Sequence, residues 1–421
     1  MLESTGKWQS DKWFVSPYNY DEETTRQLKF SPDIQLHDVT LRDGEQQAGV
    51  VFTWQDKVRI AEALAEMGVT RIEAGMPSVS DDDDRAVREI AKRLAGVQVF
   101  AFARCMIDDV KRALDCGVAG IVVEIPSSKH VIERAYGWPV QKAIDLSIEA
   151  TKYAGDHGLY TVFFPIDGTR AEEEWFFDMI AKVAAEGHMD ALAAVDTFGG
   201  ASPHGILRFI SRIQERVQVP IEAHFHDDFG LAVANTLLAL AAGVKVAHVT
   251  MSSLGERAGN AALEPLAAAL RVLYGVDLGL KLDRIASVSR LVSELAGVRT
   301  RPNQPITGDA LFRVESGIIT SWLERTVETH PVEIFPYRWD LVGQAPPEVV
   351  VGKGSGKESI VHKLRALGLS VPPETAVTEI LQAVKAASLT KRGPLTDDEF
   401  LAVAKRVAGC CLEGGATCRG N

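Results

Sequence analysis

Residues 221–251 read IEAHFHDDFGLAVANTLLALAAGVKVAHVTM, and this stretch holds the unit that decides the fold. A short apolar run, Ile221–His226, is followed by an alanine- and leucine-rich stretch, Ala232–Ala242, and by a second β-branched run, Val246–Met251. A strand, a helix and another strand in this order and spacing are typical of a parallel βαβ unit.

The same unit recurs through the first two-thirds of the chain. Eight apolar runs alternate with amphipathic stretches, and their starts lie about 30 residues apart. The runs are Ile34–Asp38, Arg71–Ala74, Val97–Ala103, Gly120–Ile125, Tyr160–Phe164, Ala191–Asp196, Ile221–His226 and Val246–Met251. Eight βα units over ~240 residues predict an α/β fold of the TIM (β/α)8 barrel type. An open Rossmann-type sheet is the alternative, but no Gly-x-Gly-x-x-Gly follows the first run.

The regular alternation stops near Leu280. We expect an N-terminal arm over residues 1–30, a barrel over 31–290, and a linker with a smaller C-terminal helical or mixed subdomain over 291–421. This subdomain is expected to cover the barrel mouth or to build a homodimer. Its glycine-rich segment, Gly352–Gly356, does not have the spacing of a phosphate-binding loop and predicts a turn.

The composition limits the class of protein. With 57 acidic and 45 basic residues the net charge is −12, and 46% of the residues are hydrophobic, as in a globular protein that does not bind nucleic acid non-specifically. No apolar stretch reaches the roughly 18 residues of a membrane span, and the N-terminus lacks a signal-peptide layout. The five cysteines form no Cys-x-x-Cys pair. We expect a cytoplasmic protein that acts on small molecules and has no membrane or nucleic-acid partner.

A candidate metal site lies where the strands of a TIM barrel end. His224 and His226 are two residues apart, so both side chains point to the same face, about 6.6 Å apart along the strand. Asp43 follows the first run, and Asn260 follows the eighth. Two imidazoles and a carboxylate suit a first-row divalent cation with open positions for substrate. Taken alone, the two histidines are equally typical of hydrogen-bonded residues near a strand end.

Three more polar residues are expected at the same mouth. Arg42 keeps its charge, so it can hold a carboxylate or stabilise an enolate oxygen, or else form a salt bridge inside the barrel. Glu73 and Thr197 are candidates to orient substrate, and Glu73 can instead pair with Arg42. Glu256 and Arg257 are expected to pair and to fix the loop before Asn260.

Four motifs in this order, LHDVTLRDGEQQAG, IEAGMP, HFHDDFGLAVAN and SLGERAGN, resemble those of a family of metal-dependent TIM-barrel synthases and lyases. The family includes 2-isopropylmalate, homocitrate and citramalate synthases and, more distantly, hydroxymethylglutaryl-CoA lyase. In the synthases the enolate of acetyl-CoA attacks a 2-oxo acid, and the thioester is then hydrolysed. Compared with the longer isopropylmalate synthases, the C-terminal feedback domain is expected to be absent.

The resemblance implies roles for individual residues. The implied metal ligands are Asp43, His224 and His226, with Asn260 at or near the metal. Arg42 is implied to face the carbonyl or alkoxide oxygen, and Thr197 to hold the substrate carboxylate. Arg104 and His130 match positions near the substrate side chain. The implied cofactor is Mn²⁺, Zn²⁺ or Mg²⁺, with an acyl-CoA as co-substrate.

The sequence departs from the family at positions that move protons. Ile166 stands where the synthases have a glutamate, Ile319 where they have a histidine, and Val332 where they have a tyrosine. An aliphatic side chain cannot transfer a proton, so another group must do so. Asp167 is our candidate for this catalytic role. The alternatives are Glu124, Tyr136, His330 and Tyr337.

Three functions follow from this pattern. The first is a metal-dependent acyltransferase that joins an acyl-CoA to a 2-oxo acid. The second is a metal-dependent aldolase or lyase that needs no acetyl-CoA, which the missing glutamate and histidine favour. The third is a protein that binds metal and 2-oxo acid without turnover.

Overall fold

The structure is a computed structural model that describes residues 6–412 of the 421-residue chain. The chain forms two compact units. The larger unit comprises Tyr18–Thr300 and Pro305–Thr307, and the smaller comprises residues 6–17, 301–304 and 308–412.

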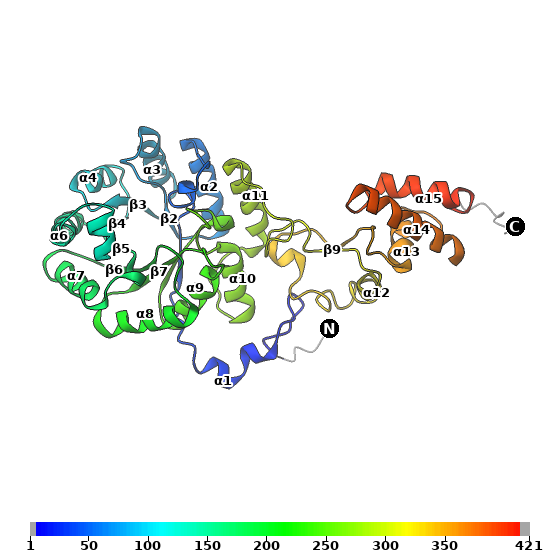
Figure 1. Ribbon diagram of the computed structural model, residues 1–421, viewed down its shortest axis with the longest axis horizontal. Helices are drawn as coiled ribbons and strands as arrows, with labels where there is room; N and C mark the ends of the chain where they lie inside the picture. Colours follow the sequence, from blue (N-terminus) through cyan, green and yellow to red (C-terminus); the bar gives the residue numbers. More distant parts are fainter. Residues whose placement is uncertain (1–5, 413–421) are drawn as a thin grey trace. The chain divides into compact units, whose positions relative to one another are not determined.

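The larger unit is a closed barrel of eight parallel strands, in which β8 pairs back onto β1. This arrangement confirms the predicted TIM-barrel fold. The strands are β1 (Gln35–Asp38), β2 (Arg71–Glu73), β3 (Gln98–Arg104), β4 (Gly120–Pro126), β5 (Tyr160–Ile166), β6 (Ala191–Asp196), β7 (Ile221–Phe225) and β8 (Val246–Val249). Strands β2 to β7 are labelled in Figure 1.

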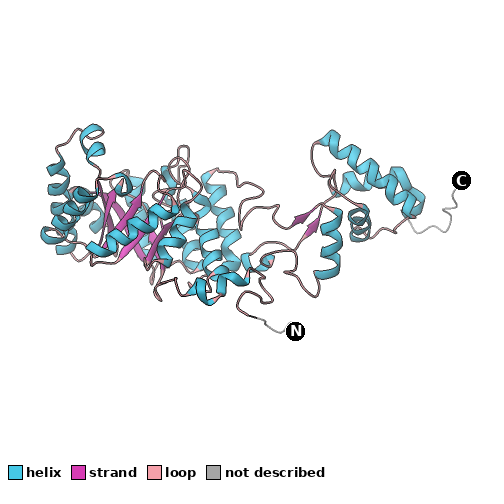
Figure 2. Cartoon of the chain, turned by 60° about the horizontal axis from the view of Figure 1, so that its bottom comes forward, coloured by secondary structure: helices cyan, strands magenta, loops and turns pink. Residues whose placement is uncertain are grey.

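Helices surround the strands on the outside of the barrel (Figures 1 and 2). They are α2 (Trp54–Met67), α3 (Asp81–Arg93), α4 (Ile107–Asp115), α5 (Lys129–Arg134), α6 (Val140–Asp156), α7 (Glu173–Glu186), α8 (Pro203–Arg216), α9 (Ala232–Ala241), α10 (Leu263–Leu273) and α11 (Ile285–Ala296). Local sequence sets several of their ends. Helix α2 begins with a capping box, in which Thr53 and Asp56 bond to each other's backbone N–H groups. It ends at Gly68, whose φ of 108° suits glycine.

The interior of the barrel has an apolar side and a polar side. Strands β3 to β6 contribute the apolar side, with Phe100, Val122 and Phe164 in one buried cluster. Strands β1, β7 and β8 instead bury imidazole and carboxylate groups, among them His37, Glu222, His224 and His248, each at most 1% exposed. Buried charged and polar groups persist only when they are paired or bind a ligand. The polar side is therefore the candidate region for a functional site.

The smaller unit has a two-stranded parallel sheet and four α-helices (Figure 2). Its elements are β9 (Arg313–Val314), α12 (Gly317–Thr326), β10 (Glu348–Val349), α13 (Lys357–Ala366), α14 (Glu374–Lys391) and α15 (Asp397–Leu412). Helices α13 to α15 share a core in which Ile360, Ile380, Val384 and Phe400 are fully buried. The glycine-rich segment before α13 is a turn, as predicted.

Residues 6–30 divide between the two units. In the smaller unit, Lys12 forms an ion pair with Asp340 (2.8 Å), and Trp13 makes a β-bridge with Tyr337. In the larger unit, the short helix α1 (Glu22–Thr25) follows Tyr20, whose hydroxyl donates to the Val272 carbonyl (2.7 Å). None of the helices within residues 6–412 is long and apolar enough to cross a membrane.

Candidate metal centre and active site

Asp43, His224 and His226 meet at the mouth of the barrel, as the sequence predicted. The two Nε2 atoms of the histidines are 3.3 Å apart, and they lie 3.2 Å and 3.8 Å from the same Asp43 oxygen, Oδ2. Ligand atoms bound to one cation at about 2.0–2.2 Å are separated by about 3 Å. The three side chains therefore have the spacing of a ligand set that shares one metal ion.

Unsatisfied polar atoms support the fit to a cation. Asp43 Oδ1 and Asn260 Oδ1 are buried and have no hydrogen-bond partner among the described residues. Such groups are costly to bury unless a ligand satisfies them. Burial lowers the pKa of His226 to about 4, although Asp43 opposes this, so the imidazole stays neutral and keeps a lone pair for a metal. Burial alone would raise the pKa of Asp43, but the charge of Arg42 and the hydrogen bond with His224 hold it well below its usual range.

Asn260 is held beside this group. It makes a β-bridge with His226, and its Nδ2 donates to the Leu254 carbonyl (3.1 Å), which leaves Oδ1 as the open acceptor. Gly255 makes room for it, because a Cβ at this position would lie 2.3 Å from Asn260 Nδ2 and 3.2 Å from Asp43 Oδ1. The φ of 145° at Gly255 is also one that other residues rarely adopt.

Arg42 lies next to the three candidate ligands and is 6% exposed. Its Nε donates to Glu73, its Nη1 donates to Asp43 (3.1 Å), and its guanidinium stacks over Phe102 at 3.9 Å. Its Nη2 is buried without a partner in the part of the chain that the structure describes. Glu73 thus takes the alternative role of pairing with Arg42, and it is fully buried rather than at the cavity wall.

A cavity of about 180 Å³ opens above the candidate ligands. Its lining residues are Arg42, Asp43, Gln46, Phe102, Glu124, Phe164, Ile166, Val195, Thr197, His224, His226 and Glu256. Thr197 is therefore at the mouth, as predicted, and its Oγ1 accepts the N–H of Asp167 (2.8 Å). Burial raises the pKa of Glu124 to about 7, even though Arg42 and Arg104 favour its ionised form.

Three residues predicted at the site have other partners. Arg104 donates from Nε and Nη2 to the two oxygens of Asp109 (2.7 Å and 3.0 Å), and its side chain is half-exposed. The carboxylate of Asp167 accepts two hydrogen bonds from Arg170 (2.6 Å and 3.1 Å) and lies 3.2 Å from His130 Nε2. None of Arg104, His130 and Asp167 is among the described residues that line the cavity.

The loop before Asn260 has the expected pair of Glu256 and Arg257, together with shorter contacts of Arg257. Arg257 makes its short bonds to Asp228, both at 2.9 Å, whereas Glu256 is 3.6 Å away. Arg257 also donates to the Thr197 carbonyl (2.6 Å). The expected pair with Glu256 is thus the weaker contact. Glu256 also lines the cavity.

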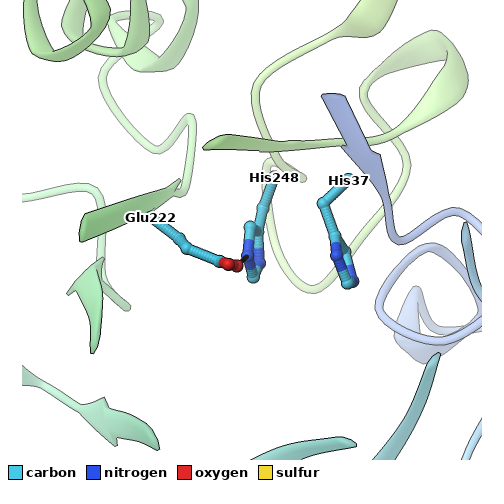
Figure 3. A group of neighbouring side chains, drawn as sticks. All are labelled: His37, Glu222 and His248. Atoms are coloured by element: carbon cyan, nitrogen blue, oxygen red, sulfur yellow. Dashed lines mark hydrogen bonds and ion pairs between the residues drawn. The ribbon is translucent and has the colours of Figure 1, made fainter. Parts of the chain in front are cut away.

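A second group of buried titratable side chains lies deeper on the polar side, and sequence reasoning missed it. His37, Glu222 and His248 come from β1, β7 and β8 and are drawn in Figure 3. Glu222 is two residues before His224, so strand alternation places both on the inward face and was the available signal. Burial raises the pKa of Glu222, but Arg71 and His248 outweigh it and bring the pKa to about 2.

The chain is similar to a known protein family and to curated relatives along most of its length. Residues 33–292 match the HMGL-like family model. Homocitrate synthase AksA of Methanopyrus kandleri is 38% identical over 392 residues, which cover 92% of this chain and 96% of that protein. The probable 2-isopropylmalate synthase of the same organism is 37% identical over 84% of this chain and 70% of that protein. The (R)-citramalate synthase CimA of Methanocaldococcus jannaschii is 33% identical over 90% of this chain and 76% of that protein.

Among solved structures, the HMG-CoA lyase of Bacillus subtilis is similar in fold. It superposes with a TM-score of 0.58 at 22% identity, over 64% of this chain and 96% of that one. The match between the family model and the barrel, together with relatives above 30% identity along most of their length, identifies the chain as a member of the HMGL-like family.

Proposed function

We propose that this protein is a divalent-metal-dependent acyltransferase that forms a C–C bond between an acyl-CoA and a 2-oxo acid. The observation that carries the proposal is the convergence of Asp43, His224 and His226 inside a cavity beside Arg42. The relatives named as homocitrate, isopropylmalate and citramalate synthases support the same reaction class.

Asp43, His224 and His226 hold the metal in this proposal, and Asn260 Oδ1 is available as a further ligand. A divalent cation bound there supplies Lewis-acid polarisation of a carbonyl. The two imidazoles favour manganese or zinc over magnesium, which prefers an all-oxygen site.

Arg42 and Thr197 bind the 2-oxo acid. The buried Nη2 of Arg42 has no partner among the described residues, so it can donate to the carbonyl oxygen and stabilise the negative charge that develops there. The Thr197 oxygen already accepts the N–H of Asp167, so its own O–H is left to donate to the substrate carboxylate.

Glu124 moves the proton. It lines the cavity that contains the candidate ligands, and a pKa near 7 is well matched to a general base at neutral pH. Its carboxylate removes a proton from the carbon next to the thioester. That carbon then attacks the 2-oxo carbonyl, whose oxygen takes up a proton, and water hydrolyses the thioester to release CoA. Glu124 is preferred to Asp167, because two bonds from Arg170 hold the Asp167 carboxylate.

The wall of the cavity suggests the class of 2-oxo acid. Phe102, Phe164, Ile166 and Val195 line it, and Arg42 is the single cation among the described lining residues. A second carboxylate on the substrate would have no positive partner there. An alkyl side chain is therefore favoured over an acidic one.

Thiol release from acetyl-CoA tests the proposal against a panel of pyruvate, 2-oxoisovalerate and 2-oxoglutarate, with added Mn²⁺ or Zn²⁺ and with Asp43→Ala as the blank. Metal-dependent release with one of the alkyl acids is the expected result. Absence of thiol release with every acid would contradict the proposal.

The second candidate is an aldolase or lyase without acetyl-CoA, which is favoured by Ile166 at the cavity wall, where the synthases carry a glutamate. It predicts a released carbonyl fragment and no thiol. The cytoplasmic location and the homodimer expected from the sequence also belong to the proposal. Light scattering of the purified protein tests the dimer.

A further inference from the structure

A chain of hydrogen bonds runs from the interior of the barrel to His224. Arg71 donates from Nη1 and Nη2 to the two oxygens of Glu222 (2.9 Å and 3.3 Å). His248 Nε2 lies 2.8 Å from Glu222 Oε2, and His248 Nδ1 lies 3.3 Å from His224 Nδ1. All four residues are at most 2% exposed, so water does not compete for these contacts.

The direction of each bond follows from the chemistry of its end groups. Glu222 is paired with Arg71 and is therefore ionised, and a carboxylate can only accept. His248 must then carry its proton on Nε2, which leaves Nδ1 of the neutral ring as an acceptor. His224 completes the chain by donating to it from Nδ1, and a cation bound at Nε2 removes the competing contact of that atom with the Asp43 carboxylate (3.2 Å). The lone pair of His224 is thereby placed on Nε2, the atom that faces Asp43 and His226.

We infer that Arg71, Glu222 and His248 are positioning residues that fix His224 as the tautomer able to bind a metal through Nε2. The inference rests on the metal centre of the proposed function and adds the groups that orient one of its ligands. Metal-bound histidines usually donate their second N–H to such a partner, and loss of that partner typically weakens metal binding 10- to 100-fold.

His37, Glu222 and His248 could also be read as a second cation site, since their ligand atoms lie close together. Three observations argue against that reading. Both Glu222 oxygens already accept hydrogen bonds. The Arg71 guanidinium is next to them and would repel a cation. Finally, the rings of His37 and His248 are stacked 4.5 Å apart at an angle of 17°, so their in-plane lone pairs run side by side instead of converging (Figure 3).

Titration of the metal-free protein with Mn²⁺ alone tests the inference. We expect one bound equivalent per wild-type chain and a 10- to 100-fold weaker dissociation constant for His248→Phe. His248→Gln should recover much of the affinity, because an amide can both donate to Glu222 and accept from His224. His37→Gln is the matched control: it removes the ring stacked on His248, keeps a donor for Glu73 (3.3 Å from His37 Nε2) and changes no bond in the chain, so its affinity should equal that of the wild type.

Equal affinity in His248→Phe and the wild type would overturn the inference while leaving the proposed function in place. Binding of two equivalents of Mn²⁺ per wild-type chain would overturn the inference and would indicate a second metal site. If the wild type bound no Mn²⁺, both the assigned metal centre and the proposed function would be refuted.

A second measurement needs no variant. In the wild type loaded with diamagnetic Zn²⁺ and labelled with ¹⁵N-histidine, the NMR shifts of His224 should show a protonated Nδ1 and an Nε2 that carries no proton. A proton on Nε2 would refute the inference, whatever the variants do.

Discussion

Replacing Glu124 with glutamine should make the protein more stable and nearly inactive at the same time. The substitution keeps the shape of the side chain and removes its ionisation. Burial raises the pKa of Glu124 from 4.5 to about 7, so the native state disfavours the carboxylate. A group that is only structural would not be expected to combine a gain in stability with a loss of turnover.

The size of the stability change follows from the shift in pKa. At 1.36 kcal/mol per pKa unit, the ionised side chain costs the native state roughly 3 kcal/mol above pH 7. Between pH 4.5 and about 7 the native state holds a proton that the unfolded chain has lost, so the free energy of unfolding falls as the pH rises through this window. Glu124→Gln should therefore raise that free energy by up to about 3 kcal/mol at pH 8 and by less than about 1 kcal/mol at pH 5.

Urea unfolding at pH 5 and pH 8 measures this change, and metal-free protein is required because a nearby cation would favour the carboxylate. In the metal-loaded enzyme kcat/KM should fall about 100- to 10,000-fold. The wild type should lose activity as the pH falls through about 7 or somewhat lower, since a base must be deprotonated. The pH profile of the variant should not show this acidic decrease. A variant that is less stable at pH 8, or that retains activity within tenfold, would refute the role of Glu124.

Four further changes test other parts of the structure. Asp43→Ala should abolish metal binding and thiol release but leave the circular dichroism spectrum unchanged, and wild-type turnover in this variant would exclude the assigned centre. Gly255→Ala should weaken Mn²⁺ binding, because the added methyl group would lie 2.3 Å from Asn260 Nδ2; an unchanged dissociation constant would show that this close approach is unimportant. Arg42→Lys should lower kcat/KM about 100-fold in steady-state assays, as the forked donor is lost; full activity would mean that a point charge suffices. Phe400→Ala should destabilise the smaller unit by about 3–5 kcal/mol in urea unfolding, since this fully buried ring would leave a cavity, and a loss below 1 kcal/mol would contradict the packing described.

The barrel and its candidate ligands were predictable because short-range patterns determine them. The two-residue spacing of His224 and His226 puts both on one face, and strand ends gather at one mouth whatever the exact strand register. Thr197 and Asp43 were placed at the mouth by the same reasoning. The structure brings these side chains to one cavity.

The deeper network was not predictable, because it depends on how the barrel closes. His37 and His248 are more than 200 residues apart, and they become partners through the register of β1 against β8. The position of Glu124 on an inward face was visible in the alternation of β4, but its pKa depends on burial that only the folded chain shows. Arg104 was assigned from motif similarity, and Asp167 as a replacement for the glutamate that Ile166 displaces. Neither argument reveals that Arg104 pairs with Asp109 and that Asp167 pairs with Arg170.

The central claim is that the metal-loaded protein forms a C–C bond between an acyl-CoA and a 2-oxo acid. The most direct measurement is ¹³C NMR of a reaction that contains [2-¹³C]acetyl-CoA, Mn²⁺ and 2-oxoisovalerate or pyruvate. The account predicts that the labelled methyl signal is replaced by a methylene bonded to a quaternary carbon that bears a hydroxyl, with an equal amount of free CoA and no conversion in Asp43→Ala. A label that remains in acetyl-CoA with every acid, while the protein demonstrably binds metal and 2-oxo acid, would contradict it.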